Sequence, residues 1–317
     1  MNLGFIFSLP RAGSTYTLRV LSAGKGIRTS SEPWLMPALL GIRSGRQPFA
    51  EFHYDHVRIG LDALLTETGA GEEAWREGVR AMATTLYSHL AGPDDTFIDK
   101  TPRNSLFTRE IIETFPDAPC LFLWRNPLSV IHSMNETWGK GRWKAYFYEI
   151  DLLDGLKHMV DTYALVRDRP NVLAVRYEDL VADPDAAWPK IFAHFGSEFD
   201  PAYAKNPPRL NVRMGDQSGQ KKYAQTSAAS VASWLEGIDT PIRKGWVRRY
   251  LHELGAERLA TMGYELDELL AQLSEAKQHF RASDIPLIWL SRAYHKCSPF
   301  VWSARRKARA DRSFSLR

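Results

Sequence analysis

Short apolar runs alternate with longer amphipathic stretches along much of this chain. Four runs have the length and composition of buried strands: Gly4–Ser8, Thr96–Asp99, Pro119–Arg125 and Val172–Tyr177. Each is followed by a stretch with helical periodicity: Thr15–Ala23, Leu106–Phe115, Leu128–Trp138 and Ala187–Phe195. Apolar strands that are joined by helices form parallel sheets covered on both faces. The pattern therefore predicts an α/β, three-layer fold with a central, mainly parallel sheet flanked by helices.

The remaining stretches add helices and one long polar loop. Glu72–Leu90, Thr240–Leu254 and Glu257–Phe280 look helical, whereas Arg43–His56 has only weak periodicity. Asn206–Ser230 is polar and rich in Gly, Pro and Lys, which is typical of a surface loop that covers a site. No internal repeat or linker divides the chain. We therefore expect one domain over residues 1–280 and a basic, aromatic C-terminal extension over residues 281–317.

The positive charge is concentrated at the C-terminus. The chain has 41 Lys and Arg against 37 Asp and Glu, a net charge of +4. From Arg292 to Arg317, eight basic residues stand against the single acidic Asp311, a net of +7, so the rest carries −3. Such a charge distribution argues against a nucleic-acid partner. The extension suits a solvated end best; contact with an anionic membrane surface or a partner, a homodimer included, is the alternative.

Two further features concern the cellular compartment. Only two cysteines are present, Cys120 and Cys297, which favours a reducing compartment over a disulfide framework. No apolar run approaches the ~18–20 residues of a membrane-spanning helix, and the first residues lack the pattern of a signal peptide. We expect a cytoplasmic protein without a transmembrane segment.

The segment after the first strand reads Leu9-Pro10-Arg11-Ala12-Gly13-Ser14-Thr15-Tyr16. Glycine lets the backbone turn tightly so that successive N–H groups point at an anion, and the helix N-terminus adds partial positive charge. Arg11 supplies a full charge, and Ser14 and Thr15 supply hydroxyl donors. The first Gly and the Lys of the nucleotide-triphosphatase loop are absent. The segment predicts a P-loop-like anion site; a plain strand–turn–helix with a capping serine is the alternative.

A second segment also joins a buried strand to a helix. Leu121–Trp124 leads into Arg125-Asn126-Pro127, and Ser133 stands about two turns into the expected helix. Open α/β sheets bind ligands at the carboxyl ends of their strands. Arg125 and Ser133 are therefore candidates for holding a second phosphate group. The alternative is that Arg125 pairs with a carboxylate and Ser133 is an ordinary helix residue.

Together these segments resemble the sulfotransferases that use 3′-phosphoadenosine 5′-phosphosulfate (PAPS). In that family a P-[KR]-[SA]-G-[ST]-[ST] loop holds the 5′ phosphosulfate, and Pro10–Thr15 matches it. A later R-[ND]-P-x(5)-S segment holds the 3′ phosphate, and Arg125–Ser133 matches it. Val175–Leu180 resembles the R-Y-E-D-L strand end, which implies that Tyr177 lies near the adenine. The resemblance covers residues 4–195, more weakly to residue 265, and implies a phosphosulfate-binding loop after strand 1.

The resemblance also implies roles for individual residues. Arg11, Ala12, Gly13, Ser14 and Thr15 would bind the co-substrate. Tyr16 stands where many members carry an adenine-stacking Trp. Asp99-Lys100-Thr101-Pro102 resembles a [DN]-K-x-P segment whose Lys meets the bridging oxygen and the sulfuryl group, so Lys100 would stabilise the leaving phosphate. Lys221 and Lys222 fall where the family closes a loop over the cofactor; a solvated loop is the alternative.

The catalytic base departs from one branch of the family. Members that act on phenols and alcohols carry a His shortly after this Lys, and Pro102 stands there instead. The branch that acts on protein tyrosine and some carbohydrates uses a Glu after the first helix, and Glu32 in Ser30-Ser31-Glu32-Pro33-Trp34 is similar. We take Glu32 as the base, with His53 and His56 as reserve candidates. The simpler alternative is a surface carboxylate.

The resulting hypothesis is in-line transfer of the sulfuryl group from PAPS to a hydroxyl or amine of a small-molecule acceptor, a natural product among them, with PAP as product. Arg11 and Lys100 would neutralise the leaving group, and the sequence shows no spaced metal-ligand cluster, so we expect no metal. A protein tyrosine or a carbohydrate is the alternative acceptor. The rival functions are a kinase-like P-loop phosphotransferase, which needs a Lys that this loop lacks, and a non-catalytic nucleotide- or membrane-binding protein.

Overall fold

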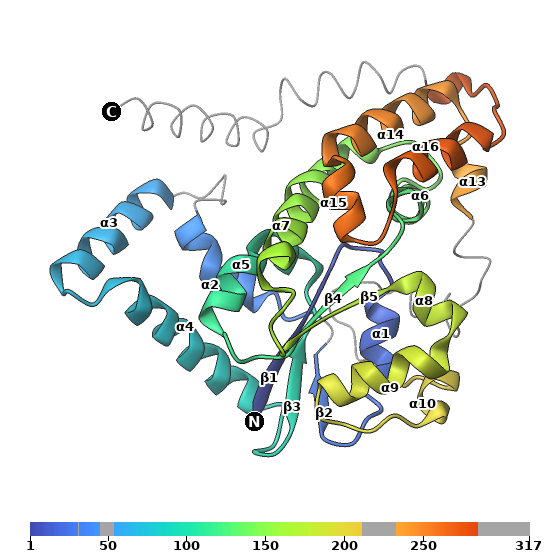
Figure 1. The fold of residues 1–317 in the computed structure, drawn as a ribbon. Helices are drawn as coiled ribbons and strands as arrows, with labels where there is room; N and C mark the ends of the chain where they lie inside the picture. Colours follow the sequence, from blue (N-terminus) through green and yellow to red (C-terminus); the bar gives the residue numbers. More distant parts are fainter. Residues whose placement is uncertain (31, 45–53, 211–232, 285–317) are drawn as a thin grey trace.

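A five-stranded sheet forms the centre of the computed structural model, which describes residues 1–30, 32–44, 54–210 and 233–284 (Figure 1). The strands are β1 (Asn2–Ser8), β2 (Ile27–Thr29), β3 (Thr96–Asp99), β4 (Cys120–Trp124) and β5 (Val172–Arg176). Their order is β2-β3-β1-β4-β5, and each neighbouring pair is parallel. The predicted α/β class with a parallel central sheet is confirmed.

Helices cover both faces of this sheet (Figure 1). The α-helices are α1 (Ser14–Leu21), α2 (Leu35–Ser44), α3 (Tyr54–Glu67), α4 (Gly71–Ser88), α5 (Thr108–Thr114), α6 (Pro127–Thr137), α7 (Leu156–Val166), α8 (Tyr177–Ala182), α9 (Pro184–His194), α10 (Pro201–Lys205), α13 (Trp234–Gly237), α14 (Pro241–Leu254), α15 (Ala256–Thr261) and α16 (Leu266–Glu275). Short 3₁₀ helices cover Pro102–Phe107, Ala145–Tyr148 and Ala282–Asp284, and a π-helix covers Ile150–Gly155.

The alternation of side chains along β1 separates two apolar layers. Phe5 and Phe7 belong to a buried cluster that includes residues of α5, α6, α7 and α14. Ile6 belongs to a second buried cluster with residues of α1, α8 and α9. Because successive side chains of a strand point to opposite faces, both faces of the sheet are buried and the three layers follow. The α3–α4 pair extends away from these layers (Figure 1).

Several helices begin at a polar residue followed by proline. Asn126, Asp183 and Thr240 each accept a hydrogen bond from a backbone N–H group in the first turn of α6, α9 and α14, respectively. Proline then occupies the first helical position, where a missing N–H group costs nothing. The Asn126 cap and Pro127 fix where α6 begins, and therefore place Ser133 at the seventh residue of that helix.

Parts of the secondary-structure prediction are wrong. The single helix expected over Glu257–Phe280 is two helices, because Gly263 adopts a φ of 83° between α15 and α16, and the second ends at Glu275. The strand expected to include Tyr177 ends at Arg176, and Tyr177 begins α8. The helix expected from Leu106 starts as a 3₁₀ turn and becomes α-helical only at Thr108.

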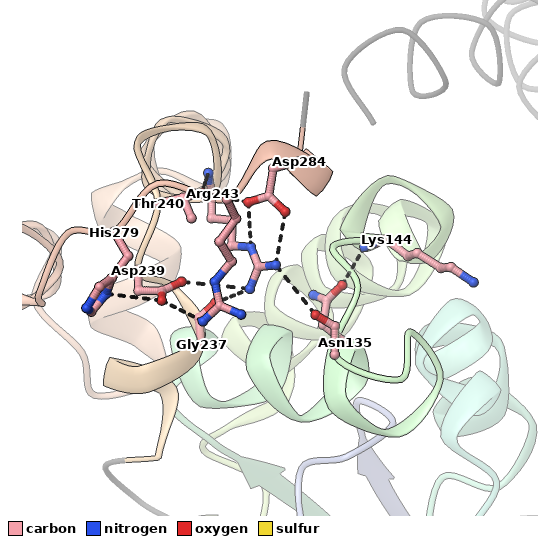
Figure 2. Close-up of polar contacts among 10 residues, drawn as sticks. Asn135, Lys144, Gly237, Asp239, Thr240, Arg243, His279 and Asp284 are labelled. Atoms are coloured by element: carbon pink, nitrogen blue, oxygen red, sulfur yellow. Dashed lines mark hydrogen bonds and ion pairs between the residues drawn. The ribbon is translucent and has the colours of Figure 1, made fainter. Parts of the chain in front are cut away.

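Residues 281–284, the first part of the predicted extension, contact α14. The guanidinium of Arg243 donates two hydrogen bonds to Asp284, at 2.9 and 3.0 Å, and Thr240 donates a third at 2.8 Å (Figure 2). Arg243 is 4% exposed and Asp284 is 1% exposed. A charged pair buried to this degree is stable only when its hydrogen bonds are satisfied. Residues 285–317 lie outside the described residues.

Candidate active site

The turn between β1 and α1 has an unusual backbone. Arg11 and Gly13 both have positive φ angles, 67° and 93°, and Gly13 precedes the first residue of α1. A Cβ atom on Gly13 would lie 2.4 Å from a ring carbon of Tyr177, far closer than any real contact. Only glycine tolerates both the left-handed conformation and this close approach. The turn therefore packs directly against the ring of Tyr177, which the sequence placed in a separate motif.

The loop arginine meets the second motif. Arg11 Nε donates a hydrogen bond to Ser133 Oγ at 3.2 Å, across 122 positions of sequence. Arg125 Nη1 donates to the carbonyl oxygen of Arg11 at 2.8 Å. The contacts arise because β1 and β4 are neighbours in the sheet, so the residues that follow them lie at the same edge. The two segments predicted to hold two phosphate groups are thus adjoining parts of one site.

Tyr177 joins the third motif to the same place. The guanidinium carbon of Arg125 lies 4.6 Å from the centroid of the Tyr177 ring, within the range of a cation–π contact. The ring therefore has Gly13 on one part of its surface and Arg125 on another. This contact fixes the orientation of the Arg125 fork beside the turn.

Lys100 and Glu32 form a buried ion pair at this edge. Lys100 Nζ lies 2.9 Å from Glu32 Oε1 and 3.4 Å from Thr15 Oγ1. The side chain of Lys100 is 2% exposed and that of Glu32 is 9% exposed. Lys100 follows β3, Glu32 follows β2, and Thr15 lies in the first turn of the helix after β1. Neighbouring strands thus bring the predicted base and the predicted lysine into contact.

Tyr16 belongs to α1, and its side chain packs against α9. Its ring is edge-on to Trp188, with centroids 6.0 Å apart, and its hydroxyl donates to the carbonyl oxygen of Ala204 at 3.2 Å. It is 8% exposed. Ser14, the first residue of α1, and Ala12 are also buried. The adenine-stacking role of Tyr16 stays a prediction.

Other predicted site residues fall outside the described part of the structure. Lys221, Lys222 and His53 lie in segments whose placement is not described. His56 belongs to α3, but only its backbone is described. Their roles also remain predictions.

A buried polar cluster beside Lys100 was missed by the sequence reasoning. The carboxylate of Asp99 is fully buried and accepts hydrogen bonds from Tyr87 at 2.7 Å, Thr101 at 3.0 Å and Asn104 at 3.3 Å. Burial raises the pKa of the Asp99 carboxyl, and these donors and the Lys100 charge act against that rise. The available signal was the charged Asp99 at the end of a strand that is otherwise apolar.

The described residues contain neither a group of metal-ligand side chains nor a helix that could span a membrane. Among them, no three or more His, Cys, Asp or Glu side chains are grouped so that they could hold a metal ion. None of the helices described is both long and apolar enough to cross a membrane.

Comparison with known proteins agrees with this geometry. A profile of the sulfotransferase family matches residues 5–201. Nodulation protein NoeE of Sinorhizobium fredii is 28% identical over 295 residues, which are 82% of this chain and 65% of that protein. The protein-tyrosine sulfotransferase of Drosophila melanogaster is 22% identical over 281 residues, 84% of this chain and 52% of that one. This chain thus spans less than two thirds of either relative.

A solved structure shows the same fold. The sulfotransferase domain from the curacin biosynthetic pathway matches with a TM-score of 0.52 and 18% identity, over 83% of this chain and 98% of that domain. The fold, the converging motifs and the family profile, which spans more than half of the sequence, agree. The chain therefore belongs to the sulfotransferase family.

Proposed function

We propose that this protein transfers a sulfuryl group from PAPS to a hydroxyl or amine of a small-molecule acceptor, with Glu32 as the base. One observation carries the proposal: the Glu32 carboxylate lies 2.9 Å from the Lys100 ammonium, beside the first turn of α1. A carboxylate and an ammonium in contact at a strand edge combine a proton acceptor with a group that stabilises negative charge.

The residues of the site fit an anionic group of the PAPS type. Arg11, Lys100 and Arg125 supply cationic donors, and Thr15 supplies a hydroxyl, all around the N-terminus of α1. No side chain caps that terminus at Gly13. Backbone N–H groups and the helix dipole at such a position favour phosphate or sulfate oxygens. Arg11 and Lys100 would hold the 5′ phosphosulfate, and Arg125 with Ser133 would hold the 3′ phosphate.

The chain's own groups account for the transfer step. Glu32 takes the proton of the acceptor hydroxyl as the acceptor oxygen bonds to sulfur. Lys100 and Arg11 stabilise the electron pair that passes to the phosphate oxygen when the sulfur–oxygen bond breaks. Such preorganised cationic donors act strongly where water is excluded. PAPS supplies the activated sulfuryl group, and PAP is the product.

The test begins with the wild-type protein. It is incubated with PAPS and a panel of phenols, alcohols, amines, sugars and tyrosine peptides, and mass spectrometry detects a product that is heavier by one SO₃ group. Isothermal titration calorimetry measures PAP binding. Transfer only to a tyrosine peptide or a sugar would overturn the small-molecule assignment. Stabilisation of the folded protein by ATP–Mg²⁺ and not by PAP would overturn PAPS as the donor.

Substitution of the ion pair tests the two roles. We expect Glu32→Gln to lower kcat by about 100-fold or more, the usual loss for a general base, while PAP affinity stays close to wild type. Lys100→Ala should lower kcat by a similar factor and also weaken PAP binding. Glu275→Gln and Lys190→Ala, on exposed positions of α16 and α9, are the matched controls. Unchanged turnover in Glu32→Gln would mean that the base is another residue.

A further inference from the structure

A chain of hydrogen bonds connects the buried cluster at Asp99 to the segment that carries Glu32. Thr101 Oγ1 donates to Asp99 Oδ1 at 3.0 Å. Thr101 Oγ1 in turn accepts a hydrogen bond from the backbone N–H of Trp34 at 3.2 Å. Asp99 and Thr101 are both fully buried. These two hydrogen bonds therefore connect the end of β3, through the Thr101 hydroxyl, to a residue two positions after Glu32.

Asp99 determines which way the Thr101 hydroxyl donates its hydrogen bond. Asp99 Oδ1 accepts hydrogen bonds from both Thr101 and the side-chain amide of Asn104, so the Thr101 proton points at this oxygen. The lone pairs of Thr101 Oγ1 are then available to the N–H of Trp34. Tyr87, which is 3% exposed, donates to the other oxygen of Asp99 at 2.7 Å and holds the carboxylate in place. The hydroxyl of Thr101 is thus an oriented acceptor.

The backbone at Trp34 needs such a restraint. Its φ is 56°, a conformation that is uncommon for a bulky residue and costs on the order of 1 kcal/mol or more. Pro33 fixes the preceding φ angle. The stretch from Glu32 to Trp34 consequently has little freedom while the Trp34–Thr101 bond is made. Thr101 is also the residue directly after Lys100. One residue is therefore joined to Lys100 through the backbone and to the Glu32 segment through the hydrogen bond from Trp34.

We propose that Thr101 is a positioning residue whose hydroxyl, oriented by Asp99, holds the Glu32 segment so that the carboxylate that takes the acceptor's proton stays beside the Lys100 ammonium. The inference rests on the proposed function, because it assigns Thr101 to the reaction that Glu32 and Lys100 perform. Thr101 itself touches neither the acceptor nor PAPS in this assignment. Its effect passes through the N–H of Trp34.

The first test needs no turnover. In the unliganded protein, amide hydrogen exchange is measured at Trp34 for the wild type, Thr101→Val and Thr101→Ser. Valine keeps the shape of threonine and removes the oxygen, whereas serine keeps the oxygen. We expect exchange at Trp34 to accelerate about tenfold or more in Thr101→Val, as for the loss of a hydrogen bond, and to stay near wild type in Thr101→Ser. Equal exchange in all three proteins would overturn the proposed bond.

The second test separates positioning from folding. We expect Thr101→Val to bind PAP within about twofold of wild type while kcat falls about tenfold, and Thr101→Ser to restore kcat. In the Glu32→Gln background, Thr101→Val should cause no further loss, because residues that act as one unit are not additive. In the Ser133→Ala background, the loss of kcat caused by Thr101→Val should multiply with any loss of kcat caused by Ser133→Ala. Loss of PAP affinity and thermal stability in parallel with kcat would show a structural role only.

Failure of the proposed function and failure of the positioning role give different results. If the wild type neither binds PAP nor transfers sulfate, the proposed function fails, and the exchange result at Trp34 still decides whether Thr101 restrains that segment. If the wild type is active and the Glu32→Gln background shows the full additional loss, the positioning role fails alone. Should Thr101→Val not fold, Thr101→Ala removes the same oxygen without placing a methyl group beside Asp99, and the same outcomes apply.

Discussion

Single residues of this site serve more than one contact, and Gly13 shows it most clearly. It allows the left-handed turn before α1, and it leaves room for the ring of Tyr177. Tyr177 in turn stacks on Arg125, which donates to the carbonyl of Arg11. A change at Gly13 would therefore reach the groups proposed to hold both phosphate groups of PAPS.

Gly13→Ala tests this coupling at the scale of one residue. The new Cβ would lie 2.4 Å from the Tyr177 ring, so the ring and the Arg125 guanidinium must shift. We expect PAP affinity to fall about tenfold or more, the cost of misplacing one charged hydrogen bond. Isothermal titration calorimetry measures the change.

The matched control is Gly196→Ala. Gly196 also has a positive φ, 74°, but a Cβ there meets nothing within 4 Å. Both variants pay the backbone cost of about 1 kcal/mol, and chemical denaturation should show it in both. Only Gly13→Ala should lose PAP affinity. Equal PAP affinity in the two variants would contradict a coupling between the Gly13–Tyr177 contact and the groups proposed to hold the phosphates.

Among the elements, α14 depends on a buried charged pair. Arg243, in its first turn, donates from two nitrogens to Asp284 (Figure 2). Both side chains are almost completely buried. An exposed pair of the same chemistry is present as well, since Arg258 of α15 makes two bonds to Asp161 of α7. The side chains of that second pair are 35% and 53% exposed.

The two pairs give a prediction about stability. Asp284→Asn leaves the charge of Arg243 buried with only partial compensation, and we expect a loss of about 3 kcal/mol in the free energy of unfolding. Asp161→Asn should cost less than about 1 kcal/mol, because water screens the exposed pair. Urea denaturation measures both values. A chain ending at residue 280 should lose stability like Asp284→Asn; if it does not, the buried pair contributes little.

Sequence patterns predicted some elements and not others, for physical reasons. The strands β1, β3 and β4 bury most or all of their side chains, and the apolar β5 pairs with β4 although its side chains are only partly buried, so composition alone indicates these four strands. β2 has three residues, of which only Ile27 is buried, and no pattern can form over that length. It nevertheless delivers Glu32 to the site. The helix break at Gly263 depends on a local φ that periodicity does not reveal.

The site was predictable only as far as its motifs are local. Arg11, Gly13, Arg125 and Ser133 stand in short segments with recognisable chemistry, and the structure brings them together. The bond between Thr101 and the N–H of Trp34 joins residues 67 positions apart through a buried hydroxyl. No local pattern encodes such a pair, because it follows from the packing of β2 beside β3.

At the scale of the whole molecule, ligand binding and folding depend on the same sheet. The site draws residues from position 11 to position 177, and they meet only because β2, β3, β1, β4 and β5 are neighbours in that order. A ligand that binds this edge binds the folded chain and not the unfolded one. PAP should therefore stabilise the sheet as a unit, by mass action.

Cys120 offers a direct measure of that linkage. It lies in β4, is 2% exposed, and burial raises the pKa of its thiol to about 12. At pH 8 the folded protein therefore presents almost no Cys120 thiolate, and a thiol reagent reaches it only after the sheet opens. The chain has one other cysteine, Cys297, so the Cys297→Ser variant isolates the signal from Cys120.

In that variant we expect thiol labelling of Cys120 to follow the population of the unfolded state. PAP at about 100 times its dissociation constant should slow labelling by about 100-fold, because it stabilises the folded state by about 2.7 kcal/mol. Labelling in concentrated urea, with and without PAP, is the control and should be equally fast. Rapid labelling in native buffer that PAP does not slow would mean that β4 opens separately from the site. Slowing by PAP would instead show that β4 and the ligand-binding site unfold as one cooperative unit. This is expected because the site lies at the carboxyl ends of β1, β3 and β4, which are the inner strands of the sheet.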